Sequence, residues 1–88
     1  MTPITSWIKA KEALRVGDRI TVQITSIQVY GAHARPCEEG MTEVVCLFHL
    51  PEIASGWAPQ KGQTVEARIL DFAEQSREIY LTTKPIIR

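Results

Sequence analysis

Apolar and polar residues alternate along a segment near the start of this chain, and the alternation changes phase part-way. Between 18 and 25 the apolar positions include Val22 and Ile24, but after residue 26 they become Ile27 and Val29. Alternation with a period of two predicts a strand with one buried face. A one-residue change of phase is typical of a β-bulge, which bends a strand enough for it to serve two sides of a small barrel.

Four further segments are predicted to be strands, at 32–37, 44–48, 64–69 and 79–82. The segment 38–43 between the first two contains glycine and glutamate and is typical of a turn. A hairpin centred there would pair Cys37 with Cys46. Strict alternation would then put His33 and His49 on opposite faces unless Pro36 or the strand ends break it. The sequence leaves this register open.

Two helical segments complete the pattern. The segment 50–55 has Pro51 in its first turn and Gly56 at its end. A short helix is favoured over 6–14, with Thr5 or Ser6 as its cap and Trp7 on its inner side. Five strands with a helical turn between the third and fourth match the five-stranded Greek-key barrel called the OB-fold, whereas a sandwich of this length usually needs seven strands. We therefore predict an all-β fold forming one domain over residues 1–88, because 88 residues are too few for two cores.

Five short motifs follow one another in order between about residues 14 and 84. They are LRVGDRI at 14–20, IQVYGAH at 27–33, LFHLPEI at 47–53, KGQTV through ILD at 61–71, and IYLT at 79–82. In this order they resemble the S1 RNA-binding domain family, and we interpret the chain as a stand-alone single-domain member, which the initiating methionine favours. The resemblance implies an OB barrel that binds single-stranded RNA on an exposed face carrying aromatic residues and a histidine.

The resemblance also assigns roles to individual residues. Tyr30 matches the first aromatic residue of the family's RNA face, and His33 stands where the second, usually phenylalanine, is expected. His49 looks like the family histidine. Asp71 is similar to the polar residue that ends the fourth strand. These four are therefore candidate RNA-binding residues.

Two arginines complete the candidate set, although the sequence departs from the family near one of them. The family tends to place an arginine directly before the last strand, but Glu78 occupies that place and Arg77 comes one residue earlier. Arg68 is predicted to point outward from the fourth strand, beside Glu66. We include Arg77 and Arg68 as candidate RNA contacts. The family also commonly has a glycine where Cys46 stands here.

Rings displayed on a barrel surface suit single-stranded RNA, because every base has a flat π-face on which a ring can stack without reading sequence. An imidazole at His33 keeps part of the stacking area of a phenyl ring and adds a donor, or a positive charge in mildly acidic solution. Gly31 is predicted to permit a kink or a close backbone approach between Tyr30 and His33. Each of these side chains also has a purely structural interpretation, as a strand aromatic or a surface histidine.

Charge argues for modest binding. Ten basic and ten acidic residues leave no net charge, so nothing in the total attracts a polyanion. The cations, which include Lys84, are scattered, and two to four neutralised phosphates would give a shallow salt dependence. An alternative is an OB-fold protein-interaction module that has lost RNA binding, which the neutral charge, the missing phenylalanine and the acidic pair at 38–39 favour. Trp7, Trp57, Phe48 and Phe72 are predicted to be packing residues.

Other classes of protein find little support. Zinc is an option for His33, Cys37, Cys46 and His49, but their spacing lacks a tight two-cysteine knuckle, so we expect no metal and no cofactor. We predict no enzyme, since no phosphate loop, nucleophile elbow or obvious carboxylate pair is present. No apolar run could span a membrane and no export signal is seen, which predicts a cytoplasmic protein with reduced cysteines. The partners expected are single-stranded RNA and the ribosome or an RNA-processing complex, in translation or RNA metabolism. The sequence does not decide whether the chain prefers RNA or single-stranded DNA, nor its oligomeric state.

Overall fold

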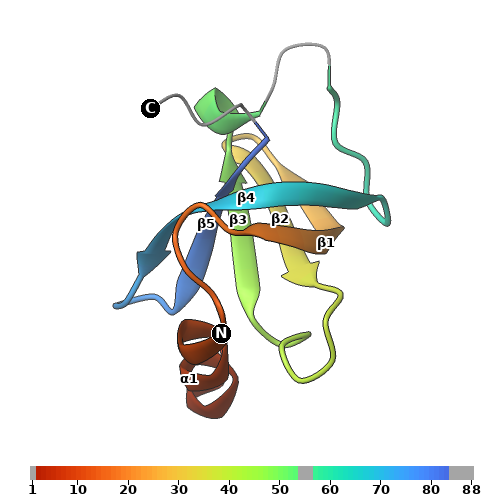
Figure 1. The fold of residues 1–88 in the computed structure, drawn as a ribbon. Coiled ribbons are helices and arrows are strands. Elements are labelled where there is room, and N and C mark those ends of the chain that lie inside the picture. Colours follow the sequence, from red (N-terminus) through yellow and green to blue (C-terminus); the bar gives the residue numbers. More distant parts are fainter. Residues whose placement is uncertain (1, 54–56, 84–88) are drawn as a thin grey trace.

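Five strands form a closed barrel in the computed structural model, which describes residues 2–53 and 57–83 (Figure 1). The strands are β1 (Arg19–Gln28), β2 (Gly31–Pro36), β3 (Val45–His49), β4 (Thr64–Ala73) and β5 (Glu78–Thr82), in the spatial order β1-β2-β3-β5-β4. β3 and β5 pair in parallel, and every other neighbouring pair, including the closing pair β1 and β4, is antiparallel. The helix α1 (Ile4–Ala13) precedes the barrel, and the 3-10 turn η1 (Leu50–Glu52) follows β3. The predicted OB-fold is confirmed.

The bulge predicted in the first strand is present in β1. Its pairing with β2 shifts register between Ile24 and Ser26. Before the shift, Val22 and Ile24 point into the core, and after it Ile27 is about half exposed. Residues 19–23 of β1 pair with β4 and residues 22–28 pair with β2, so one bent strand serves two sides of the barrel. A second bulge lies in β4 between Ile69 and Asp71.

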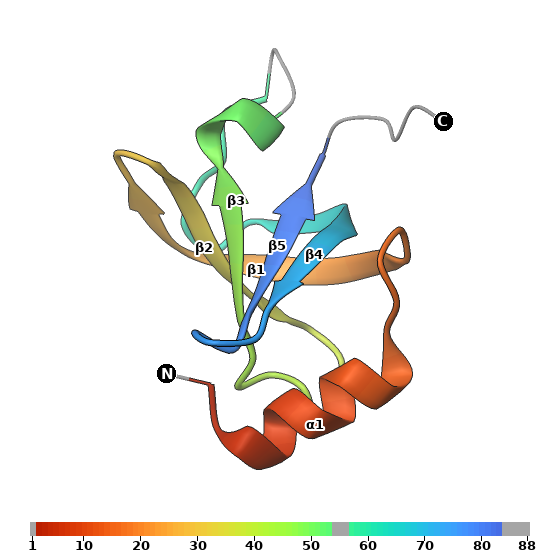
Figure 2. The same ribbon diagram turned by 90° about the vertical axis from the view of Figure 1, so that its left-hand side faces the viewer.

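The helix α1 covers one end of the barrel, opposite the end that carries η1 (Figure 2). Its inner side buries Trp7 and Ala10, and the Trp7 ring meets the edge of Phe72 at a centroid distance of 5.9 Å. The helix predicted over 6–14 is thus present, but the predicted cap at Thr5 or Ser6 is wrong. The helix begins at Ile4, because Pro3 is the N-cap residue: its backbone is extended, with φ −60° and ψ 145°, and its carbonyl accepts the first helical hydrogen bond, from the Trp7 N–H at 3.0 Å.

The predicted turn after β3 is shorter than expected. It spans Leu50–Glu52 rather than 50–55, with Pro51 in its first turn as predicted. The predicted end at Gly56 lies outside the described residues. Beyond it, Trp57 packs its ring on buried Phe48 at 5.6 Å, which confirms the packing role of both.

The structure decides the register of the β2–β3 hairpin, which the sequence left open, and it is not that of a tight hairpin. Cys46 pairs with Ala34, three residues away from the predicted partner Cys37. The connection from 37 to 44 causes the shift, because it buries Met41 and Val44 in the core instead of forming a tight turn. A shift by an odd number of residues exchanges the two faces of a strand. A tight hairpin would have put His33 and His49 on opposite faces, and the observed register puts them on the same face.

Gly31 brings the start of β2 against the end of β3. It has φ +150°, and a Cβ placed on it would lie 1.7 Å from the carbonyl oxygen of Phe48. It pairs with His49, and the Leu50 N–H donates to the Tyr30 carbonyl at 2.9 Å just beyond. The close backbone approach predicted for Gly31 is confirmed, and no side chain fits there.

Replacing this glycine tests the constraint. We expect Gly31→Ala to lower the free energy of unfolding by about 3 kcal/mol or more, because it adds a backbone clash to an unfavourable φ. Gly62→Ala is the matched control. Gly62 also has a positive φ, of +88°, but a Cβ there meets nothing within 4 Å, so the loss should be only about 1 to 2 kcal/mol. Urea unfolding followed by tryptophan fluorescence measures both, and equal losses would contradict this account.

Candidate nucleic-acid interface

Strand pairing aligns four side chains in one row across the outside of the barrel. His33 on β2 lies opposite Leu47 on β3, Leu47 lies beside Tyr80 on β5, and Tyr80 lies opposite Asp71 on β4. Paired residues point to the same face, and so does His49, two residues beyond Leu47. His33 and His49 therefore share the outer face, which settles the alternative that the sequence left open. Figure 2 looks onto the strands β2, β3 and β5 that carry this row.

The rings on this face form two pairs. Tyr30 and His33 have ring centroids 5.7 Å apart, and the Tyr30 hydroxyl lies 3.1 Å from Nε2 of His33. His49 and Tyr80 meet edge to face at 4.9 Å. Tyr30 is 46% exposed, and the other three rings are half-buried. We call these four residues the ring cluster; it brings together the predicted residues Tyr30, His33 and His49.

Leu47 forms an apolar floor within the ring cluster. It points outward but is only 6% exposed, because its register neighbours His33 and Tyr80 lie on either side of it. Rings, rather than strand backbone, therefore make up the accessible surface at this point of the barrel. Such a surface offers planar stacking partners with an apolar base beneath them.

The predicted polar residues Asp71 and Arg68 lie on the adjoining part of the same outer surface. Asp71 is exposed beside Tyr80, and its carboxylate accepts from the Phe72 N–H at 2.8 Å. Arg68 lies opposite Thr82, two residues along β5 from Tyr80, and it donates to the Gly17 carbonyl at 3.2 Å. Asp71 borders the ring cluster, and Arg68 lies one step further away with its guanidinium anchored.

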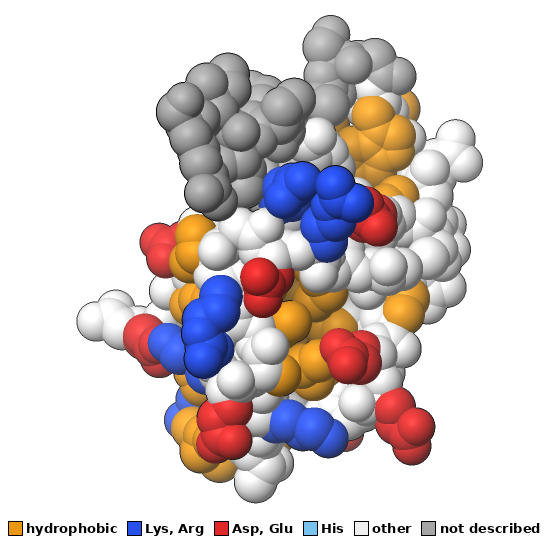
Figure 3. Space-filling view, viewed as in Figure 1, with side chains coloured by type: hydrophobic (Ala, Val, Ile, Leu, Met, Phe, Trp, Pro, Cys, Tyr) orange, Lys and Arg blue, Asp and Glu red, His pale blue; other side chains and the backbone are white. Residues whose placement is uncertain are grey.

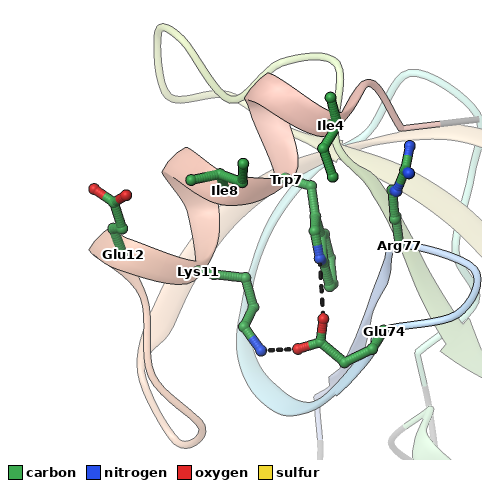
Figure 4. A pocket seen from close by; sticks show the side chains of 7 residues that line it. All are labelled: Ile4, Trp7, Ile8, Lys11, Glu12, Glu74 and Arg77. Carbon is green, nitrogen blue, oxygen red and sulfur yellow. Dashed lines mark hydrogen bonds and ion pairs between the residues drawn. The ribbon is translucent and has the colours of Figure 1, made fainter.

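The structure does not bring Arg77 to the ring cluster. Arg77 lies in the turn between β4 and β5 with φ 54°, and it lines a groove beside α1 together with Trp7 (Figure 4). The turn carries it toward the helix end of the barrel. Its assignment as an RNA contact thus has no geometric support from its neighbours.

Sequence reasoning missed Tyr80. The alternation of Ile79 and Leu81 as inward residues already implied that Tyr80 points outward. The alternation did not predict that β3 pairs in parallel with β5. This pairing puts Tyr80 beside Leu47 and His49. The two strands are separated in the chain by all of β4.

Positive charge near the ring cluster is sparse. Arg35 follows His33 by two residues on the outer face of β2, and it donates to the Glu43 carbonyl at 2.9 Å. On another side of the molecule, basic and acidic side chains are interspersed (Figure 3), and Arg19 lies 3.8 Å from Glu66. The charge pattern in these regions is mixed, as expected for a chain of zero net charge.

The cysteines and histidines of the zinc hypothesis do not converge. Cys46 points into the barrel core, whereas His33 and His49 point outward and Cys37 is exposed beyond the end of β2. Burial raises the pKa of the Cys46 thiol to about 12, and the nearby Arg35 offsets this only in part. Within residues 2–53 and 57–83 no three metal-ligating side chains gather. None of the helices described is long and apolar enough to cross a bilayer.

Comparison with known proteins identifies solved structures of the same fold. No protein-family model matches the chain, and no curated protein matches it in sequence. A chain in the a/eIF2alpha–aDim2p–rRNA complex from Pyrococcus horikoshii superposes with a TM-score of 0.69 at 22% identity, over 81% of this chain and 45% of that one. A multidomain protein with nucleic acid binding domains from Streptococcus pneumoniae gives 0.68 at 19%, over 89% and 28%. GSP13 from Bacillus subtilis gives 0.65 at 25%, over 83% and 62%.

These likenesses show that the chain shares its barrel fold with these structures. The chain spans less than two thirds of the length of each of these three proteins.

The contrast between the two cysteines predicts their reactivity. In the native protein we expect a disulfide reagent to modify one thiol, that of exposed Cys37, because Cys46 is both inaccessible and held as the neutral thiol. In denaturant both should react. Cys37→Ser should then show no reactive thiol when folded and one when unfolded. Rapid modification of native Cys37→Ser would contradict the inward position of Cys46.

Proposed function

We propose that this OB barrel binds single-stranded RNA through the ring cluster and acts by binding rather than by catalysis. The observation that carries the proposal is the gathering of Tyr30, His33, His49 and Tyr80 in two ring pairs on one outer face. Unpaired bases stack on such rings, and each stacked base contributes about 1 to 3 kcal/mol. The rRNA complex and the nucleic acid binding domains named among the structural neighbours support this choice of ligand.

The two pairs hold the rings ready for stacking. The contact between the Tyr30 hydroxyl and His33 restrains both side chains, and the edge-to-face contact restrains His49 and Tyr80. Restraint before binding reduces the side-chain entropy lost on binding. Tyr30, the most exposed ring, offers the first platform, and a second base would stack near Tyr80 above the Leu47 floor.

Polar groups at the edge of the ring cluster can recognise the sugar and the base edges. Asp71 can accept from an exocyclic amino group or a ribose 2′-hydroxyl, and the imidazoles can donate or accept. Arg35 lies two residues from His33 on β2, and Arg68 lies opposite Thr82, two residues from Tyr80 on β5. These two arginines can pair with phosphates of an RNA bound at the ring cluster. The 2′-hydroxyl is the group that would favour RNA over DNA.

In the cell we propose that residues 1–88 act as a single S1-type domain, working in the cytoplasm in translation or RNA metabolism. The ribosome or an RNA-processing complex would then be its larger partner. The a/eIF2alpha–aDim2p–rRNA complex among the structural neighbours supports the link to translation.

Substitution of the tyrosines tests the proposal. We expect Tyr80→Ala and Tyr30→Ala each to weaken binding of a labelled single-stranded RNA by about 5- to 150-fold, the loss of one stacked base. Tyr80→Phe and Tyr30→Phe keep the ring and should remain within a few-fold of the unmodified protein. Val16→Ala, an exposed residue in the α1–β1 connection, serves as the surface control. Fluorescence anisotropy at low salt measures all five variants.

Two outcomes would overturn the proposal. One is no saturable RNA binding by the unmodified chain, and the other is equal binding by the alanine variants. Either would favour the OB-fold protein-interaction module that has lost RNA binding. A pull-down from native extract with and without RNase would then identify a protein partner that does not depend on RNA.

The sparse cations predict a weak dependence on salt. If two to four phosphates are neutralised, the logarithm of the association constant should fall with the logarithm of salt concentration with a slope of about −1.4 to −2.8. Arg35→Gln should make the slope shallower by about 0.7 if this side chain pairs with a phosphate. A slope steeper than about −5 would show that phosphate contacts, and not ring stacking, dominate the affinity.

A further inference from the structure

A second surface, distinct from the ring cluster, lies along the outer side of α1. A groove of about 510 Å³ runs between the helix and the β4–β5 turn (Figure 4). It is lined by Ile4, Trp7, Ile8, Lys11, Glu12, Glu74 and Arg77. Its helix side carries Ile4 and Ile8, one turn apart and 48% and 50% exposed. The Trp7 ring, buried from the other side, forms part of its floor.

Charges are arranged unequally along this groove. In its middle the Glu74 carboxylate already pairs with the Lys11 ammonium and accepts from the Trp7 indole N–H at 3.2 Å. Arg77 lies toward the Ile4 end, and Glu12 lies at the opposite end of the helix (Figure 4). Within residues 2–53 and 57–83, neither of these two side chains makes a hydrogen bond or an ion pair. The groove therefore ends in a free cation on one side and a free anion on the other.

We propose that this groove is the interface of a homodimer, in which α1 of a second copy packs antiparallel along it. A two-fold axis passing beside Ile8 would bring Ile8 against the same residue of the partner. Each Glu12 would then reach the Arg77 end of the other copy. A surface with opposite charges at its two ends matches itself only when one copy is reversed, which is the condition for a two-fold interface.

The spacing of the groove residues supports this arrangement. Ile4, Ile8 and Glu12 follow at intervals of four and lie on one stripe of α1, with Ile8 at its midpoint. At 1.5 Å per residue the stripe is about 12 Å long, so reversing one helix about Ile8 exchanges the positions of Ile4 and Glu12. Arg77 lies beside the Ile4 end, so it meets Glu12 of the reversed copy. Burial of the isoleucines supplies the attraction, and the charges set the direction.

The size of the surface sets the expected affinity. One helix of ten residues and a neighbouring turn cover less than the roughly 800 Å² per partner of a standard interface. We therefore expect a weak dimer, with a dissociation constant on the order of 100 μM. The ring cluster lies on the outer face of β2, β3 and β5 and is not part of the interface.

Charge reversal gives the decisive experiment. Sedimentation velocity of the purified chain between about 10 μM and 1 mM should show a monomer–dimer equilibrium. Glu12→Arg alone and Arg77→Glu alone should each weaken it at least about ten-fold, because both cross-contacts become like-charged. An equimolar mixture of the two variants should recover a dimer, since each contact then joins opposite charges. The double variant E12R/R77E should recover it as well.

Matched controls separate this result from misfolding. Ile8→Glu should abolish the dimer, whereas Val16→Glu, at a comparably exposed apolar site outside the groove, should leave it unchanged. Recovery in the mixture requires both variants to be folded, and far-UV circular dichroism checks each alone. An unmodified chain that stays monomeric up to about 1 mM would overturn the proposal. So would dimerisation that Ile8→Glu leaves intact, or a mixture that stays as weak as its components, even if the groove binds another protein.

Discussion

The contact between the Gly31 Cα and the Phe48 carbonyl is the constraint on which the functional surface depends. The space beside the Phe48 carbonyl is too small for a Cβ atom. β2 can therefore approach β3 at this point only through a glycine. This locks Gly31 opposite His49 and, two pairs further on, His33 opposite Leu47. The histidines share the outer face as a consequence. A register displaced by one residue would turn the whole row of β2 to the other face.

Closure of the barrel adds the other half of the ring cluster. Because β5 inserts between β3 and β4, Tyr80 lies beside Leu47 and packs edge to face on His49. The pair of Tyr30 and His33 joins residues three apart in the chain, whereas the pair of His49 and Tyr80 joins two strands that are separated in the chain by β4. The burial of Leu47 also depends on closure of the barrel. Its side chain points outward, but His33 on β2 and Tyr80 on β5 cover it from both sides.

The barrel thus carries two surfaces with different chemistry. The ring cluster is aromatic, lightly charged and suited to stacking, while the groove beside α1 is aliphatic and has Arg77 at one end and Glu12 at the other. The helix serves both the core and the groove, with Trp7 buried on one side and Ile8 exposed on the other. Zero net charge is compatible with both, because neither surface relies on a large field.

The sequence by itself determined the strands, the bulge after Ile24, the close backbone approach at Gly31 and the inward or outward phase within each strand. These features follow from the period-two geometry of a strand and from steric limits at single residues. Both depend only on residues close together in the chain. Only the tertiary structure decided the β2–β3 register, the partner of Tyr80 and the place of Arg77. The register depends on the burial of Met41 and Val44 in the core. The contact of Tyr80 with His49 depends on the parallel pairing of β3 and β5, which are far apart in the chain. Such long-range packing leaves no periodic trace in the chain.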